Sequence, residues 1–236
     1  MDKRFAHLDD GTSSSSKLNK LRAGVLGAND GIVSISSVVM GVAGATNNKG
    51  SIFTAGMAAL VAGALSMAVG EYVSVSSQSD AEKMYIKKEK RELEESPEEE
   101  LEELTRAYID MGVSRNTATD VALQLTANDA VKAHLSTEFN IDENQISSPT
   151  NAALASLGAF TIGGLIPFAT IVLSPSNIRL FATGIAVVVA LSITGYTSAY
   201  AGGAPKMRAI LRIVIGGVIA MIATYLIGRA FGTSVS

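Results

Sequence analysis

The sequence predicts an all-α membrane protein, with five transmembrane helices per protomer and a cytoplasmic domain of three to four helices inserted between helices 2 and 3. Five segments are apolar over about 20 residues, the length that crosses a bilayer as a helix. Between the second and third segments lies a highly charged region, residues 80–143, which holds 17 of the 22 acidic residues. Helices are expected rather than barrel strands, because the segments are long and do not alternate between polar and apolar residues.

Composition divides the 236 residues into four parts. Residues 1–20 are polar and serine-rich, lack the apolar core of a cleaved signal peptide, and are expected to form a disordered tail. Residues 21–79 are expected to carry helices 1 and 2. Residues 80–146 are expected to form the acidic domain, and residues 147–236 to carry helices 3 to 5.

The membrane spans are predicted at residues 23–45, 52–70, 151–173, 178–201 and 209–227. They are rich in small residues. The pairs Gly27/Gly31 and Ala59/Gly63 have the four-residue spacing that lets helix backbones approach closely in lipid. Since five helices are few for enclosing a pore, a homodimer is expected.

Lysine and arginine in the short loops predict the orientation of the chain. With five spans, the N-terminus, the acidic domain and the loop near residues 202–208 share one side of the membrane. Outside the acidic domain that side carries eight Lys/Arg residues, and the other side carries three. The positive-inside rule therefore predicts that the N-terminus and the acidic domain are cytoplasmic and that the C-terminus is outside.

Start and stop signals predict the helices of the acidic domain. No helix breaker lies between residues 71 and 95, so the second span is expected to continue into the domain as its first helix. The next helix is expected to begin at Ser96-Pro97, with Glu99 closing a capping box, and to end at Gly112. Two more are expected to begin at Ser114 and at residues 128–129.

The charge distribution narrows the class of partner. Residues 80–143 carry eight Lys/Arg against 17 Asp/Glu, whereas the rest of the chain carries 11 against five. A strongly acidic domain argues against nucleic acid, whose phosphates require basic residues, and favours cations. The absence of cysteine excludes disulfides, thiolate metal ligands and cysteine nucleophiles.

Asp30 is the most costly residue of the predicted spans. A carboxylate near the middle of a spanning helix costs about 2.5–3.5 kcal/mol on insertion scales. Such residues usually face the interior of a helix bundle and act on ions or protons. The alternative is that residues 29–31 form a helix break near the interface, where Asp30 is solvated and structural.

Met67 and Glu71 lie one turn apart on the second span, so both can face the same path. The methionine sulfur is a soft ligand that suits late divalent metals better than Mg²⁺ or Ca²⁺. The alternatives are lipid-facing packing for Met67 and a solvated position at the membrane boundary for Glu71.

The acidic domain contains two pairs of glutamates spaced three residues apart, Glu89/Glu92 and Glu100/Glu103. This spacing puts each pair on one face of a helix, and a short turn can bring the two helices together. Oxygen-rich sites of this kind bind hard or borderline divalent cations. The alternative is an ordinary solvated acidic face.

His134 and Glu138 lie one helical turn apart on the last predicted helix of the domain. A lone histidine is more often a packed or surface residue than a ligand. A carboxylate one turn away makes the pair a candidate nitrogen and oxygen donor set for the same metal site.

Three stretches resemble the vacuolar iron transporter (VIT) family, including its bacterial members, and the chain is expected to be a bacterial-type member. They are residues 21–31 (LRAGVLGANDG), 63–72 (GALSMAVGEY) and 211–229, and the resemblance extends over about residues 21–232. It implies a homodimer of five-helix protomers with the transport path at the dimer interface, and a cytoplasmic helical metal-binding domain.

The resemblance also assigns roles to residues. The first-helix aspartate of the family falls on Asp30 and the second-helix methionine on Met67. The cytoplasmic glutamates fall on the four paired glutamates and on Glu138. Two positions depart from plant-like members, which carry a glutamate where Ala59 stands and a Met-Met pair where residues 134–135 are His-Leu. Glu71 could replace the missing charge, and His134 could supply nitrogen in place of sulfur.

The function predicted from these features is proton-coupled transport of Fe²⁺ out of the cytoplasm, with Mn²⁺ as a second substrate. The acidic domain is expected to capture the metal ion before it is transported. The chain is expected to be a multi-pass protein of a bacterial plasma membrane. It is not expected to be an enzyme or to hold an organic cofactor. Two alternatives stay open: a membrane-anchored metal sensor or buffer, and a ferroxidase, which the single histidine of the domain disfavours.

Overall fold

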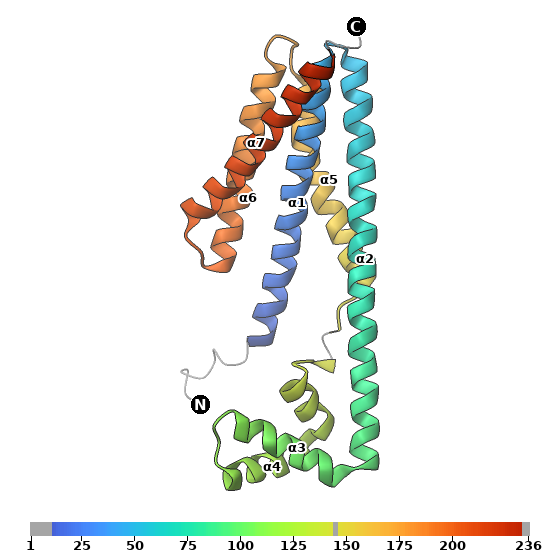
Figure 1. Ribbon diagram of the computed structural model, residues 1–236, viewed down its shortest axis with the longest axis vertical. Helices are drawn as coiled ribbons and strands as arrows, with labels where there is room; N and C mark the ends of the chain where they lie inside the picture. Colours follow the sequence, from blue (N-terminus) through green and yellow to red (C-terminus); the bar gives the residue numbers. More distant parts are fainter. Residues whose placement is uncertain (1–10, 144–145, 233–236) are drawn as a thin grey trace. The chain divides into compact units, whose positions relative to one another are not determined.

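The computed structural model describes residues 11–143 and 146–232, which form seven α-helices within those ranges (Figure 1). In chain order they are α1 (Gly11–Ala45), α2 (Lys49–Glu95), α3 (Pro97–Asp110), α4 (Arg115–Glu138), α5 (Pro149–Leu173), α6 (Arg179–Gly202) and α7 (Lys206–Gly232). Five of them, α1, α2, α5, α6 and α7, are long and apolar enough to cross a membrane. The predicted all-helical class with five spans is therefore confirmed.

The first helix begins earlier than predicted. The backbone is helical from Gly11, so the structure differs from the predicted disordered tail over residues 11–20, and residues 1–10 lie outside the described part of the chain. Residues 17–22 are mostly lysine, leucine and arginine. These residues are favourable in helices, so the helix can extend backwards from the apolar span.

The chain forms two compact units. The membrane unit comprises the residues up to Glu71 and those from Ala153 onward, and the acidic unit comprises Tyr72–Ala152. α2 contributes its first part to the membrane unit and the remainder to the acidic unit. The acidic unit is somewhat wider than the predicted domain of residues 80–146.

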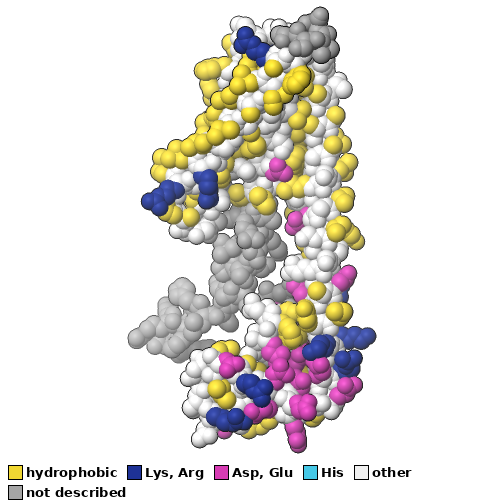
Figure 2. Space-filling model, viewed as in Figure 1, with side chains coloured by type: hydrophobic (Ala, Val, Ile, Leu, Met, Phe, Trp, Pro, Cys, Tyr) yellow, Lys and Arg dark blue, Asp and Glu magenta, His cyan; other side chains and the backbone are white. Residues whose placement is uncertain are grey.

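In the membrane unit, α1 packs between two groups of helices. One apolar core joins it to α2 and α5 through residues such as Val39, Leu60 and Phe168. A second joins it to α6 and α7 around Ile32 and Leu191. Large apolar side chains cover much of the visible surface of this unit in Figure 2, as expected of helices that face lipid. The exposed ones include Leu65, Val69, Phe181 and Ile219.

The backbone of α1 comes very close to those of α5 and α7. A Cβ atom placed on Gly31 would collide with the backbone carbonyl of Phe160, and one on Gly228 would collide with the carbonyl of Gly41. On α2, a Cβ on Gly63 would collide with the Phe160 ring. The close packing predicted at Gly31 and Gly63 is therefore confirmed, and it is possible because glycine has no side chain.

In the acidic unit, α3 packs against α4. Leu104, Ala122 and Ala133 form a small apolar core between them. The rings of Tyr85 on α2 and Phe139 after α4 stack with their centroids 4.9 Å apart. These contacts bring α2, α3 and the end of α4 together around the candidate site.

The start of α3 differs from the predicted capping box. Ser96 is the N-cap and Pro97 the first helical residue, as predicted, but the Ser96 side chain makes no cap hydrogen bond. The backbone N–H of Ser96 donates to the carbonyl of Glu92 at 2.8 Å, so it is not free to donate to the Glu99 carboxylate as a capping box requires.

The end of α3 follows the prediction at Gly112. This residue has φ +97°, a left-handed conformation that glycine adopts without strain. Its N–H donates to the carbonyl of Ile109 at 2.8 Å, and the N–H of Val113 donates to that of Tyr108 at 3.1 Å. The two bonds form a Schellman motif, which satisfies the last carbonyls of the helix.

α4 consists of two helical segments separated at Asp129, whose backbone is extended (φ −165°, ψ 92°). The Asp129 carboxylate accepts the backbone N–H of Lys132 at 3.0 Å and so caps the second segment. The break predicted at residues 128–129 is therefore confirmed. The second segment carries His134 and Glu138.

Candidate metal centre

Four side chains from three helices converge inside the acidic unit. α2 supplies Glu89, α3 supplies Glu100, and the second segment of α4 supplies His134 and Glu138. Each offers one ligand atom, and these four atoms all lie within 4.8 Å of one another. We refer to these residues as the Glu/His cluster.

The Nδ1 atom of His134 lies at the middle of the Glu/His cluster. It is 2.9 Å from a carboxylate oxygen of Glu138, 3.0 Å from one of Glu89 and 3.4 Å from one of Glu100. A single N–H cannot satisfy three carboxylates. The Glu89 oxygen that lies 3.0 Å from Nδ1 is Oε1, which is buried and forms no hydrogen bond of acceptable geometry with the described residues. The cluster thus has more acceptors than one proton can satisfy, and a bound cation would satisfy them.

The burial and close spacing of these side chains raise the pKa of two glutamates. Burial, reinforced by the carboxylates of Glu138 and Glu100, raises the pKa of Glu89 from 4.5 to about 7. Burial also raises the pKa of Glu100, although a charge on His134 opposes that shift. Like charges held together out of water favour the protonated carboxyl. Protonation of Glu89 and Glu100 is therefore favoured in the metal-free cluster, and a divalent ion would compete with protons for these carboxylates.

The donor set indicates which cations suit the cluster. Three carboxylates and one imidazole combine hard oxygen with borderline nitrogen. First-row divalent ions accept such mixed sets, whereas Ca²⁺ sites are built from six to eight oxygen atoms. His134 and Glu89 are almost fully buried, with 0% and 1% of their surface exposed, so the protein supplies most of the donors rather than water.

Two predicted ligands lie away from the Glu/His cluster. Glu92 forms an ion pair with Lys88, one turn earlier on α2, at 2.7 Å. Glu103 is exposed and lines a surface pocket of about 410 Å³ with Glu98, Glu99, Glu102 and Arg106. A three-residue step rotates about 300° around a helix, so the second member of each pair lies about 60° away from the first. Both still raise the pKa of Glu100 through their charge.

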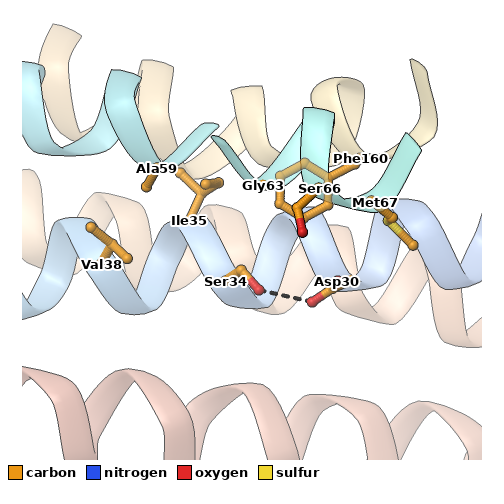
Figure 3. Close-up of a pocket in the computed structure, with 9 residues that line it drawn as sticks. All are labelled: Asp30, Ser34, Ile35, Val38, Ala59, Gly63, Ser66, Met67 and Phe160. Carbon is orange, nitrogen blue, oxygen red and sulfur yellow. Dashed lines mark hydrogen bonds between the residues drawn. The ribbon is translucent and has the colours of Figure 1, made fainter. Parts of the chain in front are cut away.

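The membrane unit contains a second candidate site, a pocket of about 320 Å³ between α1, α2 and α5. Asp30 and Ser34 of α1 and Ser66 and Met67 of α2 line it, and Phe160 of α5 contributes an apolar wall (Figure 3). The Ser34 hydroxyl donates to the Asp30 carboxylate at 2.8 Å. The pocket thus combines a carboxylate, two hydroxyls and a thioether.

The pocket includes two of the three residues predicted for the transport path. Asp30 and Met67 line it, but Glu71 is not among its lining residues in the described structure. Ala59, where plant-like members carry a glutamate, does line it. The side chain at position 59 therefore faces the same space as Asp30 and Met67.

The sequence analysis did not identify Ser34 or Ser66. A serine one turn after an intramembrane aspartate is a usable signal, because residues four apart share a helix face. For Ser66, which precedes Met67, the signal is weaker, since serine is also common where membrane helices pack closely.

The pattern of the VIT family matches this chain over residues 21–229, nearly its whole length. The chain belongs to the VIT family. Both candidate sites lie within the part that matches, and the predicted membership of the VIT family is confirmed.

Several similar proteins of the VIT family come from eukaryotes. The chain is 44% identical over 212 residues to a "Vacuolar iron transporter" of Acanthamoeba castellanii, covering 88% of this chain and 77% of that protein. It is 34% identical over 214 residues to "Vacuolar iron transporter homolog 2" of Oryza sativa subsp. japonica, covering 90% and 91%. It is 33% identical over 220 residues to "Vacuolar iron transporter homolog 3" of Arabidopsis thaliana, covering 93% and 86%. These VIT proteins are named as transporters, so the chain belongs to a family of membrane transporters and not of enzymes.

Proposed function

We propose that this VIT-family protein moves Fe²⁺, and Mn²⁺ as a second substrate, out of the cytoplasm in exchange for protons. The observation that carries the proposal is the pocket in the membrane unit, where the carboxylate of Asp30 and the thioether of Met67 face the same space. A charged residue in a span is costly and usually serves an ion or proton path. The names of the relatives support iron as the substrate.

The Glu/His cluster is proposed to capture the ion before transport, with Glu89, Glu100, His134 and Glu138 as ligands. Its oxygen and nitrogen donors suit Fe²⁺ and Mn²⁺. Glu92 and Glu103 would act at longer range, by adding negative charge that attracts a divalent ion. No organic cofactor is required by this scheme.

Release would follow from protonation. A neutral carboxyl is a poor metal ligand, so proton uptake by Asp30 or by Glu71 would weaken binding along the path. Protons entering from the far side would thereby drive the metal outward. Glu71 is retained as a path residue because it lies one turn beyond Met67 on α2.

The orientation and assembly are also proposals. The excess of Lys/Arg on one side supports a cytoplasmic N-terminus and acidic unit, with the C-terminus outside. The pocket offers one carboxylate, two hydroxyls and one sulfur, few donors for a divalent ion, which supports a homodimer with the path between protomers. Ala59 and His134 depart from plant-like members, which supports a bacterial-type protein of the plasma membrane.

Ion flux in proteoliposomes under a pH gradient tests the proposal. Asp30→Asn is expected to reduce Fe²⁺ and Mn²⁺ flux by more than tenfold, while Lys49→Gln, an exposed charge at the start of α2, leaves it unchanged. If Asp30→Asn moves both ions as fast as the wild type, Asp30 is not in the path and the proposal fails.

One observation favours a second candidate function, a membrane-anchored metal sensor or buffer. The Glu/His cluster is assembled entirely from residues of the acidic unit. It can therefore bind metal without any contribution from the spans. Tight metal binding by the full chain, with no flux through the membrane, would favour this function over transport.

A further inference from the structure

The turn between α6 and α7 concentrates positive charge that the described protein does not neutralise. Lys206, Arg208 and Arg212 are exposed at the start of α7, and none has an ion pair with an acid in the described residues. Residues 146–236 contain no Asp or Glu at all. Dark blue side chains mark this end of α7 in Figure 2. Within the described residues, no carboxylate neutralises this charge, so the surface can accept an anionic ligand.

Two tyrosines of α6 complete the same surface. The Nζ atom of Lys206 lies 4.9 Å from the ring centroid of Tyr196 and 5.6 Å from that of Tyr200. The rings are stacked, with centroids 6.4 Å apart, and Tyr200 is 72% exposed. Aromatic rings with one polar end collect at the headgroup level of membranes. We call these two tyrosines and the three cations the α6–α7 basic patch.

The backbone holds the α6–α7 basic patch in place. Gly203 turns the chain with φ +64°, and the N–H of Ala204 donates to the carbonyl of Ala199 at 3.0 Å. This turn folds the start of α7 back beside the end of α6. Arg208 and Arg212 lie one helical turn apart, so both can reach one anionic group.

The cation at the start of α6 is used differently. Arg179, at the start of α6, is 2% exposed and donates to the side-chain oxygen of Asn47 at 2.9 Å. Its charge supports the fold and is not available to a ligand. The cations of the α6–α7 basic patch, in contrast, are exposed and available to an external ligand.

We propose that the α6–α7 basic patch binds the phosphodiester headgroup of an anionic lipid. Arginine binds phosphate through paired N–H groups, and lysine adds a point charge. The anionic lipids of a cytoplasmic leaflet attract such cations, with an effect of about fivefold in affinity for each Lys or Arg. The choice of the cytoplasmic leaflet rests on the orientation given under the proposed function. The binding of a lipid headgroup to the patch does not depend on that orientation.

Lipid binding to the purified full chain in a nonionic detergent tests this proposal. Native mass spectrometry counts bound phosphatidylglycerol, with phosphatidylcholine, a zwitterionic lipid that has no net charge, as the comparison. Phosphatidylglycerol is expected to bind more tightly, and the triple variant Lys206→Gln/Arg208→Gln/Arg212→Gln is expected to bind it roughly a hundredfold more weakly. Lys49→Gln is the matched control and is expected to bind normally.

Equal binding of the two lipids would overturn the proposal, and so would unchanged binding by the triple variant. Displacement of the lipid by millimolar inorganic phosphate would also overturn it, because the patch would then be a site for free anions. Far-UV circular dichroism checks that the triple variant is folded. If it is not, Arg208→Gln and Arg212→Gln are measured singly, each with an expected fivefold loss. Metal flux is independent of this assay. A protein that binds phosphatidylglycerol but moves no metal refutes only the proposed transport.

Discussion

Replacing Glu89 by glutamine is expected to stabilise the metal-free acidic unit at pH 8 while weakening its affinity for divalent ions. Glu89 is buried in the Glu/His cluster, and its pKa is raised from 4.5 to about 7. Because the folded-state pKa lies above the unfolded value, stability contributed by the protonated carboxyl is present below pH 4.5 and is lost as the pH rises to about 7. Glutamine keeps the shape and removes this loss.

The magnitude follows from the pKa shift. A shift of one pKa unit corresponds to about 1.4 kcal/mol, so ionising Glu89 costs the folded metal-free unit on the order of 3 kcal/mol. At pH 8 the variant should therefore open roughly a hundredfold less often than the wild type. At pH 4.5 the two proteins should differ little. Metal binding runs in the opposite direction, because the ion requires the ionised carboxylate and binds more tightly as the pH rises through 7.

Hydrogen exchange measured by mass spectrometry on the full chain in detergent reports this opening. Peptides from α3 and α4 are followed in metal-free buffer at both pH values, with each rate corrected for intrinsic exchange. Glu94→Gln, an exposed glutamate on the same helix, is the control and should leave both protection and metal affinity unchanged. Equal protection of wild type and Glu89→Gln at pH 8 would refute the reasoning, and so would the same gain in Glu94→Gln.

Three further predictions concern the rest of the molecule. Gly31→Ala should destabilise the membrane unit by about 1–3 kcal/mol, because the new methyl group meets the Phe160 carbonyl. The melting temperature in detergent should fall accordingly. Gly24→Ala is the control and should leave the melting temperature unchanged, because open space surrounds Gly24. His134→Gln should alter the visible absorption spectrum of bound Co²⁺ and weaken Co²⁺ binding by at least tenfold. An unchanged spectrum would show that the imidazole is not a ligand. Asp129→Ala should lower the stability of the second segment of α4 by about 1 kcal/mol, because it removes the helix cap. Hydrogen exchange should become faster in that segment alone.

Most of the fold could be predicted because it depends on local patterns. The length of each apolar segment fixed the spans, and Gly112 and residues 128–129 marked a helix end and a helix break that the structure contains. The capping box at Ser96 failed for a reason that lies in the preceding helix. The Ser96 N–H already serves as the donor to the last turn of α2, which a motif read in isolation does not reveal.

The candidate site could be predicted only in part. The spacing of His134 and Glu138 correctly indicated a shared face, and the two side chains are hydrogen-bonded at 2.9 Å. The spacing of the glutamate pairs could not say which member turns inward. That choice depends on how α2 and α3 pack against α4, which buries Glu89 and Glu100. Their role as metal ligands is the proposal that the experiments above address.

The glycine contacts of α1 limit how the membrane unit can move during a transport cycle. At Gly31 and at Gly41 the backbone of α1 touches α5 and α7 without a side chain between them, so sliding or rotation would force main chains into one another. Alternating access would therefore have to carry α1, α5 and α7 as one rigid body. α2 meets α1 and α5 through side chains, such as Leu60 and the Phe160 ring that packs on Gly63, and not through main-chain contacts of this kind. In such a cycle α2 would be the element that moves against that body and opens the pocket to one side of the membrane at a time.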